Sequence, residues 1–240
     1  MTRRRWIADD VQGDTAALVG EHASHLARVL RAQVGQEFDI ATSNGVRRGT
    51  VMSISDSRVE FALGEVVGHR SSPEITLVLA IFKFDRMEWA MEKCTEIGVA
   101  RIIPLIAART DAHLAKAAVK RSERWQRLVL QASEQSRRAA APEITAPTKL
   151  KELCDAGSAT DARIVLAESE KGTYLRDIVK CGHGVVLVVG PEGGWADHEL
   201  QWFRASGWTA ASLGDTILRA ETAAIVATAL ATDVLREPLD

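Results

Sequence analysis

The sequence contains few cysteines and no long hydrophobic segment, and each absence argues against particular classes of protein. Three of its 240 residues are cysteines, they lie far apart, and no two form a C-x-x-C pair. Disulfides and zinc are therefore not expected, which is typical of a reducing cytoplasm. No segment approaches the roughly 18 apolar residues of a membrane span, and no apolar stretch of a signal peptide follows the basic N-terminal residues. We predict a cytoplasmic protein without membrane segment or metal.

A strong net charge is also absent, because the formal charge is −2. The distribution is uneven, however. Residues 109–138 hold eight Lys or Arg against three Asp or Glu, whereas residues 191–240 hold three Arg against eight acidic residues. A basic segment on a weakly acidic protein indicates a local anionic partner, although a solvated helix face has the same composition.

Phosphate-binding glycine motifs are missing as well, since neither G-x-G-x-x-G nor G-x-x-x-x-G-K-[ST] occurs. Two other glycine-bearing segments follow apolar runs: GPEGGW at residues 190–195 and LGDTILRAETA at residues 213–223. Glycine lets the backbone approach a ligand closely, and loops at the carboxyl ends of parallel strands form the usual ligand crevice. Because Glu192 would repel a phosphate, we predict a polar ligand that is not polyanionic.

The pattern of predicted elements changes near residue 70, which indicates two domains. Residues 1–70 are predicted to form short strands and one helical stretch, His22 to Leu30, typical of a small β-barrel, and a polar linker follows at residues 68–73. From residue 74 to residue 240, strands alternate with helices, which favours an α/β domain with a mostly parallel sheet. Strands are predicted at residues 75–82, 101–107, 164–167, 185–189 and 208–213, and helices at residues 85–97, 122–140, 196–205 and 219–235.

Charged residues at predicted helix ends are the candidates for chemistry. Arg137 and Arg138 end one helix, and Arg219 and Glu221 flank the start of the last helix. Cations are favoured at a helix C-terminus and carboxylates at an N-terminus, which explains Arg137, Arg138 and Glu221, and an ion pair with Glu221 explains Arg219. Contact with an RNA phosphate or a target base explains Arg137 and Arg138 equally well. The residues alone leave both interpretations open.

Five segments, in order along nearly the whole chain, resemble the RsmE-type 16S rRNA (uridine N3) methyltransferases, a branch of the SPOUT superfamily. The two glycine-bearing segments are similar to the C-terminal signature of that family. HLARVLR at residues 25–31, KCTEIGV at residues 93–99 and ASEQSRR at residues 132–138 are similar to three further family segments. One departure is Asp215-Thr216, where the family commonly has Pro-Arg.

The resemblance implies an N-terminal PUA-like β-barrel, a C-terminal SPOUT α/β domain with a deep trefoil knot, and a homodimer. It also implies that S-adenosylmethionine (SAM) binds in the knot. SAM carries no phosphate, so Glu192 is compatible with it. The cofactor-binding residues would be Leu166, Gly190, Pro191, Glu192, Gly193, Gly194, Leu213, Gly214, Ile217 and Leu218.

The implied reaction is methylation of N3 of a uridine in the 16S rRNA of the small ribosomal subunit. N3 lies on the pairing edge, so the base must be unpaired. Arg138 and Arg219 are expected to stabilise the developing uracil anion, and Glu221 to orient Arg219 or to relay the proton. The residues expected to bind RNA are Arg5, His25, Arg28 and Arg31. The alternatives are a methyltransferase acting on another RNA and a non-catalytic RNA-binding factor of ribosome assembly.

Overall fold

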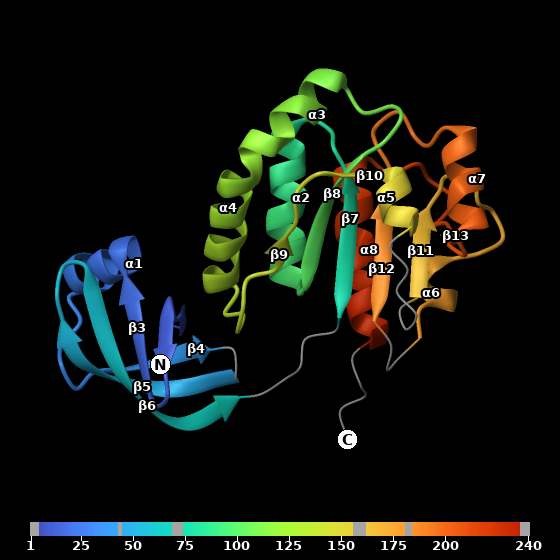
Figure 1. The fold of residues 1–240 in the computed structure, drawn as a ribbon. Helices are drawn as coiled ribbons and strands as arrows, with labels where there is room; N and C mark the ends of the chain where they lie inside the picture. The colour runs from blue at the N-terminus through green and yellow to red at the C-terminus, as the bar shows by residue number, and fades with distance from the viewer. Residues whose placement is uncertain (1–4, 43–44, 69–73, 156–161, 181–183, 236–240) are drawn as a thin grey trace. The chain divides into compact units, whose positions relative to one another are not determined.

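The computed structural model describes residues 5–42, 45–68, 74–155, 162–180 and 184–235 (Figure 1). Most of the predicted linker and Cys181 lie outside these ranges. The chain divides into two compact units. The first unit comprises residues 1–71 and 133–140, and the second unit comprises residues 72–132 and 141–240. Each unit is described by itself.

The first unit is built on a six-stranded sheet in the order β1-β4-β5-β6-β3-β2. Its strands are β1 (Arg5–Ile7), β2 (Asp10–Gln12), β3 (Thr15–Val19), β4 (Glu37–Thr42), β5 (Gly45–Ile54) and β6 (Arg58–Gly68). Only β1 and β4 pair in parallel within this described sheet. The predicted helix at residues 22–30 is observed as α1 (Gly20–Ser24) continued by a π-helix (His25–Val29). Leu26 from this helix and Phe61 from β6 are fully buried in the core.

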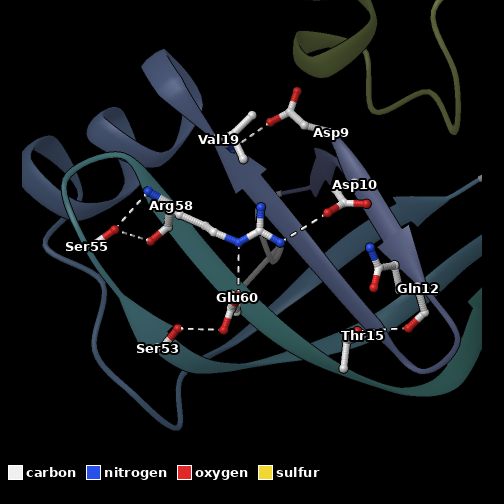
Figure 2. A network of polar contacts seen from close by, with 9 residues as sticks. All are labelled: Asp9, Asp10, Gln12, Thr15, Val19, Ser53, Ser55, Arg58 and Glu60. Carbon is white, nitrogen blue, oxygen red and sulfur yellow. Dashed lines mark hydrogen bonds and ion pairs between the residues drawn. The ribbon is translucent and has the colours of Figure 1, made fainter.

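A polar network on the exposed surface of this sheet links three strands (Figure 2). Arg58 of β6 donates to Glu60 Oε1 at 2.9 Å and to Asp10 Oδ2 of β2 at 3.1 Å. Ser53 of β5 donates to Glu60 Oε2 at 3.0 Å, and Asp9 Oδ2 accepts a backbone N–H of β3 at 2.8 Å. Exposed ion pairs contribute little to stability because solvent and salt screen them. Their effect here is to link side chains of β2, β5 and β6 across the sheet.

The second unit confirms the predicted parallel α/β sheet. Its strand order is β10-β8-β7-β12-β11-β13, with β9 on β8, and every pairing is parallel. The bounds are β7 (Ile75–Ala80), β8 (Arg101–Ile106), β9 (Glu143–Ile144), β10 (Thr148–Lys149), β11 (Ala162–Leu166), β12 (Val185–Val189) and β13 (Thr209–Ala211). The sequence patterns predict all of these strands except the two-residue β9 and β10.

Helices cover both faces of this sheet because alternate strand residues point to opposite sides. Leu77 and Leu79 of β7 belong to the core cluster shared with α2, α4 and α8, whereas Val78 belongs to the cluster shared with α5 and α7. Gly98, with φ +130°, ends α2 as predicted. The helices are α2 (Phe84–Ile97), α3 (Ala112–Ala118), the 3₁₀ turn η2 (Val119–Arg121), α4 (Ser122–Gln135), α5 (Leu150–Asp155), α6 (Leu175–Ile178), α7 (Asp197–Ala205) and α8 (Ala220–Leu235).

Helix α4 ends earlier than the predicted residue 140, at a Schellman motif. The N–H groups of Arg138 and Arg137 donate to the carbonyls of Ser133 at 2.9 Å and Glu134 at 3.2 Å, and Arg137 adopts φ +59°. The chain then leaves the helix, and residues 133–140 join the first unit. No helix in the described ranges is long and apolar enough to cross a membrane.

Candidate functional site

A cavity of about 570 Å³ lies at the carboxyl ends of three neighbouring strands of the second unit. Leu166 ends β11, Val189 ends β12 and Ala211 ends β13, and all three line the cavity. This volume is within the usual range of small-molecule sites. Nine of the predicted cofactor-binding residues line it, namely Leu166, Gly190, Pro191, Glu192, Gly194, Leu213, Gly214, Ile217 and Leu218.

One wall is the GPEGGW loop, which is held by its own tryptophan. The Trp195 Nε1–H donates to the Leu166 carbonyl at 2.8 Å, and the indole packs edge-on against Phe203. A Cβ atom at Gly190 would lie 2.9 Å from Trp195 Cε2, closer than real Cβ contacts allow. Gly190 is therefore required by the packing of Trp195, and not only by the approach of a ligand.

The other two glycines of this loop differ from Gly190. Gly194 has φ +71° and donates to the Pro191 carbonyl at 2.8 Å, so its turn requires the left-handed backbone that favours glycine. Gly193 does not line the cavity. A Cβ there would meet the Arg109 side chain at 3.5 Å, and the Gly193 carbonyl accepts a hydrogen bond from Arg109 Nη1 at 2.5 Å.

Arg109 is a cavity residue that the sequence analysis did not select. It lies in the turn after β8, where the Ala107 N–H donates to Thr110 Oγ1 at 3.0 Å and the Ala108 N–H donates to Glu199 Oε1 at 2.8 Å. Glu199 is only 1% exposed, and its other oxygen accepts the Ala196 N–H at 2.9 Å. The turn is thereby tied to the start of α7. In the sequence, the feature that points to Arg109 as a cavity residue is its position directly after a buried strand.

The second wall is the segment from Ser212 to Ala220. The Ser212 hydroxyl donates to the Gly214 carbonyl at 3.0 Å, and Gly214 has φ +141°. Ile217 is 80% exposed although it lines the cavity, so an apolar side chain stands at the cavity rim. Asp215 and Arg219 also line this wall.

Arg86, at the start of α2, lies between the GPEGGW loop and the start of α8. Its Nη1 donates to Glu192 Oε1 at 2.8 Å, and its Nε lies 3.9 Å from Glu221 Oε1. Glu221 is 6% exposed and does not line the cavity, and its Oε2 has no hydrogen-bond partner among the described residues. Within these residues, the ion-pair neighbour of Glu221 is therefore Arg86, and no ion pair joins it to Arg219.

The cavity carries charges of both signs. Lys171, Arg109 and Arg219 supply the cations. The carboxylates are Glu168, Glu192, Asp197 and Asp215. Glu168 and Lys171 were also missed by the sequence analysis, although they follow β11 at the same edge of the sheet. Such a mixed lining suits a small ligand with separate positive and negative groups better than a polyphosphate.

Arg138 belongs to the first unit and does not line the cavity. Burial lowers the pKa of its guanidinium to about 10, which leaves it charged at neutral pH. Contacts within the first unit hold its segment: Arg5 Nη1 donates to the Arg137 carbonyl, and His22 lies 3.2 Å from both Asp9 and Glu134.

Three of the four predicted RNA-binding residues are exposed, namely His25, Arg28 and Arg31. Arg28 forms a two-point contact with Asp56, at 2.5 Å and 3.1 Å, so its charge is partly compensated. Arg31 adopts φ +51° after the π-helix. Arg5 is half-buried and is directed at the Arg137 carbonyl. The described residues contain no cluster of metal-ligating side chains.

The chain is similar in sequence to known proteins over most of its length. A sequence family described as an RNA methyltransferase domain matches residues 70–232. A ribosomal RNA small subunit methyltransferase E from Synechocystis sp. is 34% identical over 223 residues, which cover 90% of this chain and 72% of that protein. A protein of the same name from Bacillus subtilis is 28% identical over 239 residues, covering 94% and 93%.

A solved structure has the same fold over nearly the whole chain. It is a ribosomal RNA small subunit methyltransferase E from Neisseria gonorrhoeae bound to S-adenosyl methionine. It has a TM-score of 0.85 and 28% sequence identity, and the match covers 98% of each chain.

Proposed function

From the premise that the chain belongs to the RNA methyltransferase domain family, and with it to the ribosomal RNA small subunit methyltransferases E, we propose that it methylates N3 of a uridine in 16S rRNA. The methyl donor is SAM. The observation that carries the proposal is the convergence of both glycine-bearing segments on one cavity at the carboxyl ends of β11, β12 and β13. The relative with bound SAM, similar over 98% of the chain, supports the choice of donor.

The chemistry of the cavity residues fits SAM. SAM has an adenine, ribose hydroxyls, an ammonium, a carboxylate and a sulfonium, and bound SAM supplies an activated methyl group. Leu213 and Leu218 offer apolar surface to the adenine, Glu168 and Glu192 offer acceptors to the cationic groups, and Lys171 offers a partner for the carboxylate. The backbone at Gly190 and Gly214 supplies further polar groups.

The residues of this chain then act by positioning and by electrostatics. Arg219 lines the cavity, and we assign it the stabilisation of negative charge on the uracil oxygens as N3 loses its proton. Arg138 remains a proposed second group for this role. Glu221 acts through Arg86 as a positioning residue for Glu192, because Glu221 is buried away from the cavity. Water or a cavity carboxylate accepts the N3 proton.

The proposal includes architecture and assembly. We assign the first unit a PUA-like barrel that binds RNA through Arg5, His25, Arg28 and Arg31, and the second unit a trefoil knot. A homodimer is supported by α8, on which Ile225, Val226 and Leu230 stay partly exposed although the helix is mostly apolar. We also propose that the protein works in the cytoplasm, where small ribosomal subunits are.

The test is mass mapping of 16S rRNA from a deletion strain, before and after addition of the purified protein and SAM. N3-methyluridine should be absent at first and restored by the wild type. Arg219→Ala should bind SAM and RNA yet lower the single-turnover rate at saturating RNA by about 100-fold, as for loss of one oxyanion-stabilising group. Modification of another RNA would identify the alternative methyltransferase, and SAM binding without any methyl transfer would favour the assembly factor.

A further inference from the structure

The helical stretch from Ala112 to Gln135 buries one side and exposes the other. Ala118, Trp125 and Val129 are at most 1% exposed and belong to the core of the second unit. Trp125 packs edge-on against Phe84 of α2, with ring centroids 5.9 Å apart. Figure 1 shows α3 and α4 as successive parts of one helical path. The orientation of this path is therefore set by apolar packing, which leaves its outer side to solvent.

Cations lie along that outer side. Lys116, Lys120, Arg124 and Arg127, called the basic row below, are all exposed and follow each other at intervals of four, four and three residues. Lys116 lies in α3, Lys120 in the 3₁₀ turn η2, and Arg124 and Arg127 in α4, and intervals of three and four make such side chains neighbours on a helical surface. Arg124 is held by Glu88 of α2, at 2.9 Å. Lys116, Lys120 and Arg127 have no hydrogen bond or ion pair with any residue in the described ranges.

The carboxylates of the same stretch neutralise this row only in part. Asp111 caps the N-terminus of α3, where it accepts the His113 N–H at 2.7 Å. Glu134 faces His22 in the first unit. Glu123 is exposed three residues after Lys120 and four before Arg127, so it offsets one of the three cations that Glu88 does not pair. The row therefore keeps an excess of positive charge that a polyanion would neutralise.

We propose that the basic row binds phosphates of the RNA substrate, as a contact of the second unit in addition to the RNA-binding residues of the first. This inference rests on the proposed function, which makes the partner a ribosomal RNA. RNA is favoured over an acidic protein because the proposed function gives the chain an RNA substrate, whose backbone carries a repeating negative charge. The net charge of −2 for the whole chain means that the local excess of cations is not a general property of the surface.

The test compares two triple variants that remove the same charge. The first is Lys116→Gln, Lys120→Gln and Arg127→Gln, and Gln preserves helix propensity. The control is Lys149→Gln, Lys151→Gln and Lys180→Gln, at exposed lysines of the same unit that lie outside the helical stretch and do not line the cavity. Binding to 16S rRNA and to unmethylated small subunits is measured by filter binding over a salt series, with SAM affinity measured in parallel.

Loss of three phosphate contacts should make the slope of log K against log[salt] shallower by about 2–3 in the first variant. The control should keep the slope of the wild type, and both variants should keep the SAM affinity and the rate at saturating RNA. Equal slopes for the two variants would overturn the proposal. If the wild type binds rRNA but transfers no methyl group, the proposed reaction fails while the comparison of slopes still decides this inference.

Discussion

Replacing Gly190 by Ala tests whether the packing of Trp195 determines the shape of the cavity. The added Cβ would lie 2.9 Å from Cε2 and 3.0 Å from Nε1 of that indole. Two contacts hold the ring in place, because its Nε1–H is bonded to the Leu166 carbonyl and Phe203 packs against it. Alanine at residue 190 must therefore displace Trp195 or the loop, and both line the cavity.

The expected cost follows from three contributions. Overpacking of a core costs about 1–3 kcal/mol, and loss of the buried indole–carbonyl hydrogen bond costs about 1 kcal/mol more. Alanine has less conformational entropy than glycine in the unfolded chain, and this offsets about 0.4–1 kcal/mol of the cost. Gly190→Ala should therefore lower the free energy of unfolding by about 1–3.6 kcal/mol and weaken SAM binding. Gly193→Ala is the matched control, since its Cβ meets only Arg109 at 3.5 Å, and it should be neutral or slightly stabilising.

Urea denaturation followed by circular dichroism measures both variants, and calorimetry measures SAM affinity. A double-mutant cycle with Trp195→Phe isolates the contact, because phenylalanine lacks the indole nitrogen and the atoms nearest the new methyl group. The cost of Gly190→Ala should fall by at least about 1 kcal/mol in the Trp195→Phe background. An equal cost in both backgrounds, or equal stability of the two glycine variants, would refute the reasoning.

Two further predictions concern charged side chains. Burial opposes ionisation of Glu88, but the hydrogen bonds and charges of Arg124 and Arg121 outweigh it and hold the pKa of its carboxyl below the ordinary 4.5. A carboxyl with a lowered folded-state pKa stabilises above its unfolded pKa, and this stabilisation is lost as the pH falls through the folded pKa. The melting temperature of Glu88→Gln should therefore lie below that of the wild type at pH 7 and approach it below about pH 4.5, and a difference that grows on acidification would contradict this. Arg86→Gln should weaken SAM binding about tenfold in calorimetry, because Glu192 loses a charged hydrogen bond. Arg86→Lys should restore part of the SAM affinity. Unchanged affinity in Arg86→Gln would show that Arg86 has no role in SAM binding.

The central strands and the longest helices were predictable because each has a clear local pattern. β7 and β12 are buried on both faces and read as continuous apolar runs, and α2 has buried side chains at helical spacing and ends at Gly98. β9 and β10 have two residues each, which is too short for any periodicity. Helix α3 was missed because it has few large apolar residues, although Asp111, which caps it, is a recognisable start signal.

The cavity was predictable only where its residues are close in sequence. The two glycine-bearing segments were recognised as units, and they line the same cavity. Arg86, Arg109 and Glu168 were not selected, because each follows or precedes a different strand of the sheet. Only the strand order β8-β7-β12-β11 brings the loops after these strands to one edge. Likewise, the pairing of Glu221 with Arg86 depends on the contact of α2 with α8, two helices separated by more than half of the chain.

The glycines show why a motif can be recognised before its physical reasons are known. From the sequence, each glycine of the two segments was interpreted as a place where backbone meets ligand. In the structure, Gly194 and Gly214 have positive φ, which is a local requirement of the backbone. Gly190 instead accommodates Trp195, so the first and last residues of GPEGGW form one packing unit. A larger residue at 190 is compatible with this loop only if residue 195 becomes smaller, and the two positions must change together.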